Sequence, residues 1–308
     1  MNSFSEYTNC RLCPRNCGVN RMSGETGYCG ETAVLRTALI DPHFGEEPSF
    51  AGTHGSGTIF LTGCSCLCIF CQNYQISRQH MGAPHSLDTL FKKIQDLIAK
   101  GVHNLNFVTP DHFWPHLRKL CHRLKECGES LPIIFNTSGY QSAKMITAHS
   151  QCADIFLSDF KFAHPELAEM CMGDRRYPEI AIAGLTQMVA EKGFLQPWDP
   201  SGQTTAREGV LVRHLVMPGH IENSLDTLRI LRREFGRLLP LSVMSQYQPM
   251  PATRGIDGFN RSLTPSEYNH VRKLVTELEF EHVYIQELND NTCFLPDFTQ
   301  EKPFNGNS

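Results

Sequence analysis

Thr58-Ile-Phe-Leu-Thr62 is an apolar, strand-like run, and Gly63-Cys-Ser-Cys-Leu-Cys-Ile-Phe-Cys-Gln-Asn73 follows it directly. Within this segment Cys64, Cys68 and Cys71 have the spacing Cys-x3-Cys-x2-Cys. Thiolates are the usual protein ligands of iron–sulfur clusters, and each of the four irons of a cubane cluster needs a terminal ligand. Three cysteines leave one iron open to a substrate or cofactor, as in open catalytic metal sites. The spacing therefore predicts a catalytic [4Fe-4S] centre held by these three residues.

With this loop the sequence resembles the radical S-adenosylmethionine (SAM) enzymes, which favour an aromatic residue, here Phe70, directly before the last cysteine. The resemblance implies that the open iron binds the amino and carboxylate groups of SAM. It also implies an oxidoreductase in which electron transfer into the cluster cleaves SAM reductively to methionine and a 5′-deoxyadenosyl radical, which abstracts hydrogen from a substrate. Phe70 is expected to pack against the adenine.

Structural zinc ligands or free thiols on a turn are the competing interpretation of these cysteines, and their spacing after a strand disfavours it. Cys66 lies between the expected ligands, where the spacing leaves it only the role of a bystander or a low-occupancy competitor. Five scattered cysteines are expected to be small buried apolar residues or inert thiols: Cys121, Cys127, Cys152, Cys171 and Cys293.

Strand-like and helix-like segments alternate along the chain, which favours parallel strands joined by right-handed helical crossovers. The predicted strands are 58–62, 104–108, 132–136, 153–158, 209–217 and 241–246. Between them lie amphipathic helical patterns, one of them capped by Ser86 and another opened by the capping box Thr264-Pro-Ser-Glu267. Six such units predict an α/β fold, a partial (βα)6 TIM-like barrel of the radical SAM type with a small N-terminal Cys-rich metal knuckle.

Polar residues stand where the later predicted strands end. In a parallel barrel, working residues lie on the loops at the carboxyl ends of the strands. The segments are Thr109-Pro-Asp-His112, Asn136-Thr-Ser-Gly139, Asp159-Phe-Lys161, Arg213-His-Leu-Val-Met-Pro-Gly219 and Gln246-Tyr-Gln-Pro249. The residues expected to bind the cofactor are Phe70, Thr109, Asn136, Ser138, Asp159, Lys161 and Arg213.

Several residues at the strand ends also have a structural interpretation. Asp159 and Lys161 point to the same side of an extended segment, so they either orient a ligand or form a simple ion pair. Arg213 either binds the carboxylate or ribose of SAM or caps carbonyls of a neighbouring loop. His112, His214 and His220 have no partner at metal-site spacing and are expected to be hydrogen-bonded scaffold residues.

The strand-end segments 136–139, 159–161 and 213–219 resemble the third, fourth and fifth strand ends of the activating-enzyme branch of the superfamily. Pyruvate formate-lyase activating enzyme and a set of its uncharacterised homologues typify that branch. The resemblance covers roughly residues 44–290 and implies that the substrate is a backbone glycine of a partner glycyl-radical enzyme. It further implies an electron donor such as flavodoxin or ferredoxin.

Two departures from the branch stand out. Its glycine-glycine-glutamate, which meets the SAM amino group, is replaced by Val108-Thr-Pro-Asp-His112, where backbone carbonyls remain as acceptors. Asn136 stands where the well-known activating enzyme has an aspartate, so the resemblance does not by itself imply a bound monovalent cation there.

A second cysteine set opens the chain: Cys10-Arg-Leu-Cys13-Pro-Arg-Asn-Cys17, followed by Cys29. Four thiols within 20 residues, with glycine and proline turns and little apolar core, predict a segment that folds around a metal. Four cysteines suit zinc or an auxiliary cubane cluster, and the spacing does not decide between them. The homologue set that the chain resembles carries the same block.

Composition bounds the remaining possibilities. The net charge is −4, with acids and bases interspersed, so neither a nucleic-acid footprint nor a polybasic membrane segment is indicated. Residues 1–9 lack the pattern of a secretion signal, and no run is long enough to span a membrane. Thirteen cysteines without such a signal favour a reducing compartment, so a cytoplasmic location is expected.

The chain is expected to divide into a Cys-rich metal-binding segment (1–43), a radical SAM barrel (44–290) and a C-terminal tail (291–308) that is disordered or contacts a partner. Two other functions stay open: radical SAM modification of a small molecule or peptide, and a non-catalytic iron–sulfur or zinc binding module. The binding module predicts four protein ligands at the central site and no cleavage of SAM.

Overall fold

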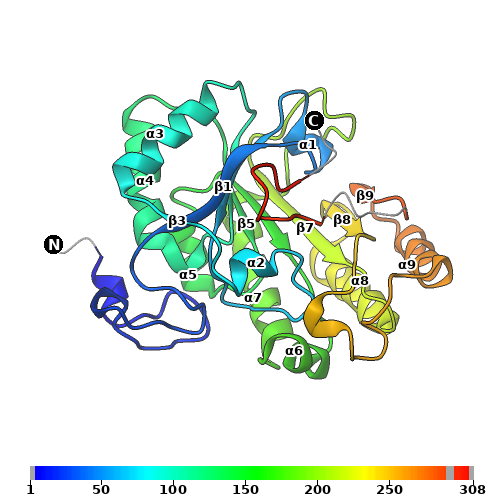
Figure 1. Cartoon of the computed structure of the whole chain (residues 1–308). Coiled ribbons are helices and arrows are strands. Elements are labelled where there is room, and N and C mark those ends of the chain that lie inside the picture. Colours follow the sequence, from blue (N-terminus) through cyan, green and yellow to red (C-terminus); the bar gives the residue numbers. More distant parts are fainter. Residues whose placement is uncertain (1–3, 289–294, 305–308) are drawn as a thin grey trace.

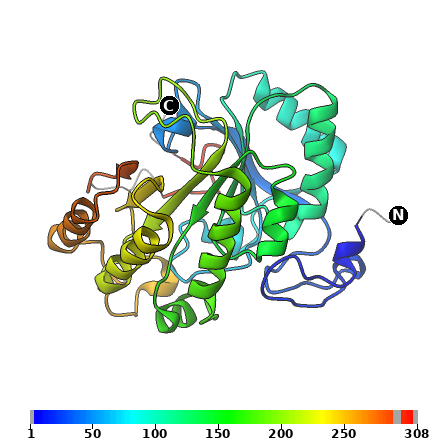
Figure 2. The same ribbon diagram turned by 180° about the vertical axis from the view of Figure 1, so that it is seen from behind.

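A computed structural model describes residues 4–288 and 295–304 of the chain. Its centre is one curved, mostly parallel sheet of nine strands, and helices cover the outer face (Figures 1 and 2). The strands are β1 Arg36–His43, β2 Ser56–Leu61, β3 Ala83–Pro84, β4 Leu105–Val108, β5 Ile133–Thr137, β6 Ile155–Asp159, β7 Gly209–Leu215, β8 Leu241–Met244 and β9 Val283–Ile285. The helices are α1 Pro48–Ala51, α2 Tyr74–Ser77, α3 Leu87–Ile98, α4 Trp114–Glu126, α5 Ala143–His149, α6 Pro165–Met172, α7 Tyr177–Lys192, α8 Ile221–Phe235 and α9 Pro265–Glu277.

The strand order is β3-β1-β2-β4-β5-β6-β7-β8-β9. From β2 to β9 all neighbouring strands pair in parallel, while β1 is antiparallel to both β2 and β3. The six predicted strands are all present, with ends within two residues of the predicted ones. The α/β partial barrel is confirmed, and β9 adds a seventh parallel strand that the sequence pattern did not reveal.

The central strands are buried on both faces, as expected for a parallel sheet covered by helices. All six residues of β2 are buried, and so are most residues of β4, β5 and β6. The helices contribute one apolar face each; on α3 the buried positions are Leu90, Phe91, Ile94 and Leu97. The parallel register brings the carboxyl ends of β2 and β4–β8 to one edge of the sheet, where the candidate site lies.

Helix ends follow the chemistry of their sequences. Ser86 caps α3 by accepting a hydrogen bond from the backbone N–H of Thr89 at 3.1 Å. At α9 the predicted capping box is confirmed: Thr264 Oγ1 accepts from the N–H of Glu267, and the Glu267 carboxylate accepts from the N–H of Thr264. In the described part of the chain, no helix is both long and apolar enough to cross a membrane.

The capping box makes a simple test of this assignment. We expect Thr264→Ala to lower the free energy of unfolding by about 1 kcal/mol, because the N–H of Glu267 loses its acceptor. Thr276→Ala on the same helix removes an exposed hydroxyl that donates to the carbonyl of Arg272, and should change stability by less than about 0.5 kcal/mol. Urea unfolding followed by circular dichroism measures both, and equal effects would contradict the capping role.

Candidate metal and cofactor site

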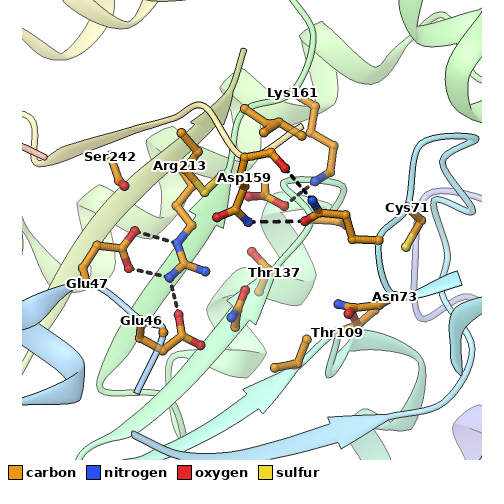
Figure 3. A pocket seen from close by; sticks show the side chains of 18 of the residues that line it. Glu46, Glu47, Cys71, Asn73, Thr109, Thr137, Asp159, Lys161, Arg213 and Ser242 are labelled. Carbon is orange, nitrogen blue, oxygen red and sulfur yellow. Dashed lines mark hydrogen bonds and ion pairs between the residues drawn. The ribbon is translucent and has the colours of Figure 1, made fainter. Parts of the chain in front are cut away.

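A cavity of about 480 Å³ lies at the carboxyl ends of the parallel strands. Figure 3 shows side chains from several strand ends converging on it. Its volume is in the usual range for a small-molecule or cofactor site, about 300–1,000 Å³. The cavity is lined by Cys64, Cys68 and Cys71 and by all seven residues expected to bind the cofactor: Phe70, Thr109, Asn136, Ser138, Asp159, Lys161 and Arg213.

The loop after β2 brings its three predicted ligand cysteines to this cavity. Gly63 begins the loop with a φ of +74°, and a Cβ there would lie 2.7 Å from the carbonyl oxygen of Cys29. Only glycine fits that turn without strain. All three cysteines are free thiols, and Cys71 Sγ accepts a hydrogen bond from the Ser77 hydroxyl at 3.3 Å.

Cys66 is buried between two of these thiols rather than set apart from them. Its backbone N–H donates to Cys64 Sγ at 3.3 Å. A hydrogen bond from the Cys66 thiol lowers the pKa of Cys64 to about 6, although burial opposes the shift. The same donor lowers the pKa of Cys68, whereas burial raises the pKa of Cys71 to about 12. Cys66 thus favours the thiolate form of two neighbours, a contribution that spacing alone did not reveal.

The three cysteines of this loop are a suitable donor set for a cubane cluster. A single zinc needs its donors to converge within about 2.0–2.3 Å of one point. Across residues 4–288 and 295–304, no three Cys, His, Asp or Glu side chains converge in that way, either at this loop or in the N-terminal Cys-rich segment. In a cubane cluster each thiolate binds its own iron, so three separate thiols on one loop are a suitable set.

Thr109, directly after β4, is held in an unusual backbone conformation. Its φ is +56°, a left-handed value that is rare for a β-branched residue. The N–H of Thr109 donates to the carbonyl of Asn136 at 2.9 Å, which ties the end of β4 to that of β5. Such strain gathers at functional sites because the surrounding structure must enforce it.

Asp111 lies two residues after Thr109, but its side chain points into the protein interior and does not line the cavity. It is fully buried and accepts a hydrogen bond from the side-chain amide of Gln141 at 2.9 Å. Burial raises the pKa of Asp111 to about 7. In the replaced segment Val108-Thr-Pro-Asp-His112, the residues that reach the cavity are therefore Val108 and Thr109.

Asp159 and Lys161, at the end of β6, form an ion pair within the cavity lining. Tyr177 supports this turn, because its hydroxyl accepts from the N–H of Lys161 at 3.0 Å and donates to the carbonyl of Ser138 at 2.9 Å. The structure therefore contains the pairing that the sequence allowed, and it also places both charges where a bound ligand can reach them.

Arg213 has partners that sequence reasoning missed. Its guanidinium donates through Nε to Glu47 Oε1 at 2.8 Å and through Nη2 to both Glu46 and Glu47 (Figure 3). The two glutamates lie between β1 and α1, about 170 positions earlier in the chain. Nothing local in Gly45-Glu-Glu-Pro48 marks them, apart from two adjacent acids before the first turn of a short helix.

Phe70 lies in an aromatic cluster beside the cysteine loop. Its ring stacks on Phe259 with a centroid distance of 6.1 Å and meets Phe162 edge-on at 6.0 Å. These neighbours hold the ring in place at the cavity wall. Its expected contact with an adenine stays a prediction.

Two of the three histidines are scaffold residues, as predicted. His112 Nε2 bonds to the carbonyl of Thr62 at 2.7 Å, and His214 bonds to the carbonyl of Phe160 and the hydroxyl of Ser224. His220 differs: its ring packs on Phe259 at 4.4 Å, and its Nε2 has no hydrogen-bond partner among the described residues. Of the scattered cysteines, Cys127 is exposed, Cys121, Cys152 and Cys171 are buried, and Cys293 lies outside the described residues.

The N-terminal Cys-rich segment packs directly against the loop that carries Cys64, Cys68 and Cys71. Arg15 donates from Nε to the carbonyl of Ser65 at 2.9 Å. Arg21, almost fully buried, donates to the carbonyls of Thr32 and His112. Within the segment Cys10 and Cys29 are buried, Cys13 is half-buried and Cys17 is exposed. Their role as ligands of a second metal site stays a prediction.

Part of the predicted tail is ordered against the barrel. Residues 295–304 cross in front of the sheet, drawn in red in Figure 1. Phe304 packs on His43 of β1 and Phe60 of β2 at 4.4 and 5.4 Å, and Asp297 accepts from the Gln75 side chain at 3.1 Å. Phe304 also lines the cavity, so this segment helps to close it.

Residues 51–169 match the family described as "4Fe-4S single cluster domain", which supports the [4Fe-4S] cluster predicted for this loop. The uncharacterized protein MJ0674 of Methanocaldococcus jannaschii is 26% identical over 290 residues, which cover 90% of this chain and 77% of that protein.

Solved structures with a similar arrangement include SuiB of Streptococcus suis bound to S-adenosylmethionine, with 9% identity and a TM-score of 0.48, covering 73% of this chain and 48% of SuiB. Another is methylornithine synthase (PylB), with 14% identity and a TM-score of 0.48, covering 72% of this chain and 60% of PylB. The chain thus spans about half the length of SuiB.

Proposed function

We propose that the protein is a radical SAM enzyme. The observation that carries the proposal is the placement of Cys64, Cys68 and Cys71 on one loop at the carboxyl end of β2, in the same cavity as the polar ends of β4–β7. The match of residues 51–169 to a 4Fe-4S domain supports the cluster. When bound, the cluster supplies the electron that cleaves SAM to methionine and a 5′-deoxyadenosyl radical.

The chain's own residues bind and orient the cofactor. Thr109, Asn136 and Ser138 offer carbonyl, amide and hydroxyl groups at the ends of β4 and β5. The Asp159–Lys161 pair adds one charge of each sign at the end of β6, which suits the oppositely charged groups of an amino acid cofactor. Phe70 and Phe304 supply apolar walls that exclude water from the reacting groups.

The N-terminal cysteines Cys10, Cys13, Cys17 and Cys29 are proposed as a second metal site, for zinc or an auxiliary iron–sulfur cluster. Four thiols in a segment with little apolar core support metal binding. Metal analysis of purified protein distinguishes the two, because zinc and iron with sulfide are measured separately.

The finer proposal is that the substrate is a backbone glycine of a partner glycyl-radical enzyme, with a flavodoxin or ferredoxin as electron donor. It rests on the resemblance of segments 136–139, 159–161 and 213–219 to the activating-enzyme branch. A glycyl radical signal in a candidate partner, seen by electron paramagnetic resonance after incubation with SAM and reductant, would support it. Radical formation only on a small molecule would contradict it.

Product analysis tests the general function. Anaerobically reconstituted protein, mixed with SAM and a strong reductant, should form 5′-deoxyadenosine and methionine in equal amounts. The spectrum of the reduced cluster should change on addition of SAM, because the cofactor binds the open iron. A protein that holds iron and sulfide yet forms no 5′-deoxyadenosine would leave only a metal-binding module.

A further inference from the structure

Arg213 is held rigidly at the end of the cavity that lies across from Cys71 (Figure 3). Glu47 accepts from both Nε and Nη2 of the guanidinium, and Glu46 accepts from Nη2. The three side chains are 13%, 8% and 6% exposed for Arg213, Glu47 and Glu46. A planar guanidinium fixed along one edge in this way cannot turn to follow a ligand.

The remaining edge of Arg213 faces the cavity. Among the described residues, Nη1 has no hydrogen-bond partner, and Figure 3 shows it on the side away from both glutamates. An arginine nitrogen carries two N–H donors there and no acceptor. Nη1 is thus a donor aimed at an acceptor oxygen of whatever occupies this end of the cavity.

The trio of Glu46, Glu47 and Arg213 carries one excess negative charge. The amide of the buried Asn106 donates to Glu46 Oε1 at 2.9 Å. The Arg213 guanidinium lowers the pKa of Glu47, although burial opposes the shift. The other charged pair of the cavity, Asp159 and Lys161, is neutral in sum. A free carboxylate or phosphate beside Nη1 would meet this excess charge in a poorly hydrated site and is disfavoured.

Uncharged amide groups also line the cavity. Gln72 Nε2 donates to the carbonyl of Gln246 at 2.6 Å, and Gln286 Nε2 donates to Gln246 Oε1 at 3.1 Å. All three glutamines line the cavity. Side-chain amides both donate and accept, so they pair well with amide groups of a ligand.

We propose that the trio end of the cavity is the substrate subsite and that it selects an uncharged amide, such as peptide backbone, over a free carboxylate. Arg213 Nη1 donates to the amide carbonyl, Glu46 and Glu47 position the guanidinium, and the excess negative charge repels anions. The inference rests on the proposed function, in which the SAM carboxylate binds iron at the cysteine end, across the cavity from Arg213. It assigns Arg213 to the substrate and not to that carboxylate.

Two probes test the selection because they differ only in the group concerned. N-acetylglycinamide ends in a carboxamide, and N-acetylglycine ends in a carboxylate. With the reconstituted holoenzyme and SAM, before reduction, we expect the amide to bind about tenfold more tightly, measured by ligand-observed NMR titration. Glu47→Gln and Glu46→Gln each remove one negative charge with almost unchanged shape, and each should bring the ratio close to one.

Arg213→Met should weaken binding of the amide itself, since the donor is lost. Glu277→Gln is the matched control, because it makes the same change on the exposed face of α9, and it should leave the ratio unchanged. Circular dichroism and iron content show that each variant is folded and loaded. Equal binding of the probes, preference for N-acetylglycine, no binding of the amide, or a ratio insensitive to both glutamine variants would overturn the subsite.

The same samples test the substrate subsite and the proposed radical SAM activity independently. After reduction, 5′-deoxyadenosine is measured in each. Its absence from the wild type contradicts the radical SAM proposal. Its normal formation together with a preference for N-acetylglycine contradicts only the assignment of the subsite.

Discussion

Cys68→Ala is expected to abolish cleavage of SAM, lowering 5′-deoxyadenosine formation by more than about a thousandfold, or about 4 kcal/mol in activation free energy. Each thiolate binds a separate iron, so the loss of one of the three protein ligands leaves two irons without a protein donor. The protein then binds the cluster too weakly to retain it. The visible absorbance of the cluster and the iron content of reconstituted protein should fall together with activity. Cys64→Ala and Cys71→Ala should behave alike.

The matched control lies in the same loop. Cys66→Ser keeps a hydroxyl that can donate to Cys64 and Cys68, so it should retain the cluster and keep SAM cleavage within about threefold. Cys127→Ala, at the exposed end of α4, should have no effect. The assignment of ligands is wrong if the serine variant loses its iron while Cys68→Ala keeps a full cluster and normal activity.

The ligand role of Cys64, Cys68 and Cys71 could be predicted because the pattern is local, with three cysteines within eight positions directly after a strand. The six strands were predictable for a related reason, since each is a short apolar run between amphipathic helices. By contrast, β9 has only three half-buried residues, and β1 contains Pro42 and charged side chains. Neither strand carries the continuous apolar pattern that distinguishes the buried ones.

The surroundings of Arg213 were beyond sequence reasoning for a physical reason. Arg213 meets Glu46 and Glu47 across a sequence separation of 166–167 residues, although β2, β4, β5 and β6 lie between β1 and β7 in the sheet order. A pattern within one window of sequence cannot contain that meeting. The contact of Phe304 with His43 and Phe60 is of the same kind, which is why the tail was expected to be disordered or to meet a partner.

The strand-end segment Asn136-Thr-Ser-Gly139 depends both on a local sequence pattern and on contacts with residues far away in the sequence. Its position after β5 was predictable, but the reason for its glycine is tertiary. Gly139 has a φ of +72°, and a Cβ there would overlap the carbonyl oxygen of Asp159 and lie 2.7 Å from the hydroxyl of Tyr177. The glycine therefore allows the end of β5 to pack against the turn that carries the Asp159–Lys161 pair.

Gly139→Ala should consequently be among the most damaging single-methyl additions in this protein. The left-handed backbone costs an alanine about 1–2 kcal/mol, and the overlap adds about 1–3 kcal/mol. We expect the free energy of unfolding to fall by about 3 kcal/mol in total, and the midpoint of thermal unfolding to fall by about 5 °C. Cleavage of SAM should also fall, because relief of the overlap moves Asp159 and Lys161.

Gly128→Ala separates strain from overlap. Gly128 follows α4 with a similar φ of +80°, but a Cβ there would have nothing within 4 Å. This variant should therefore show only the backbone cost, about 1–2 kcal/mol, and should cleave SAM normally. If differential scanning calorimetry finds equal losses for the two variants, then β5 and the turn after β6 are not packed as closely as the structure has them, and Gly139 has no special part in holding the charged pair at the cavity.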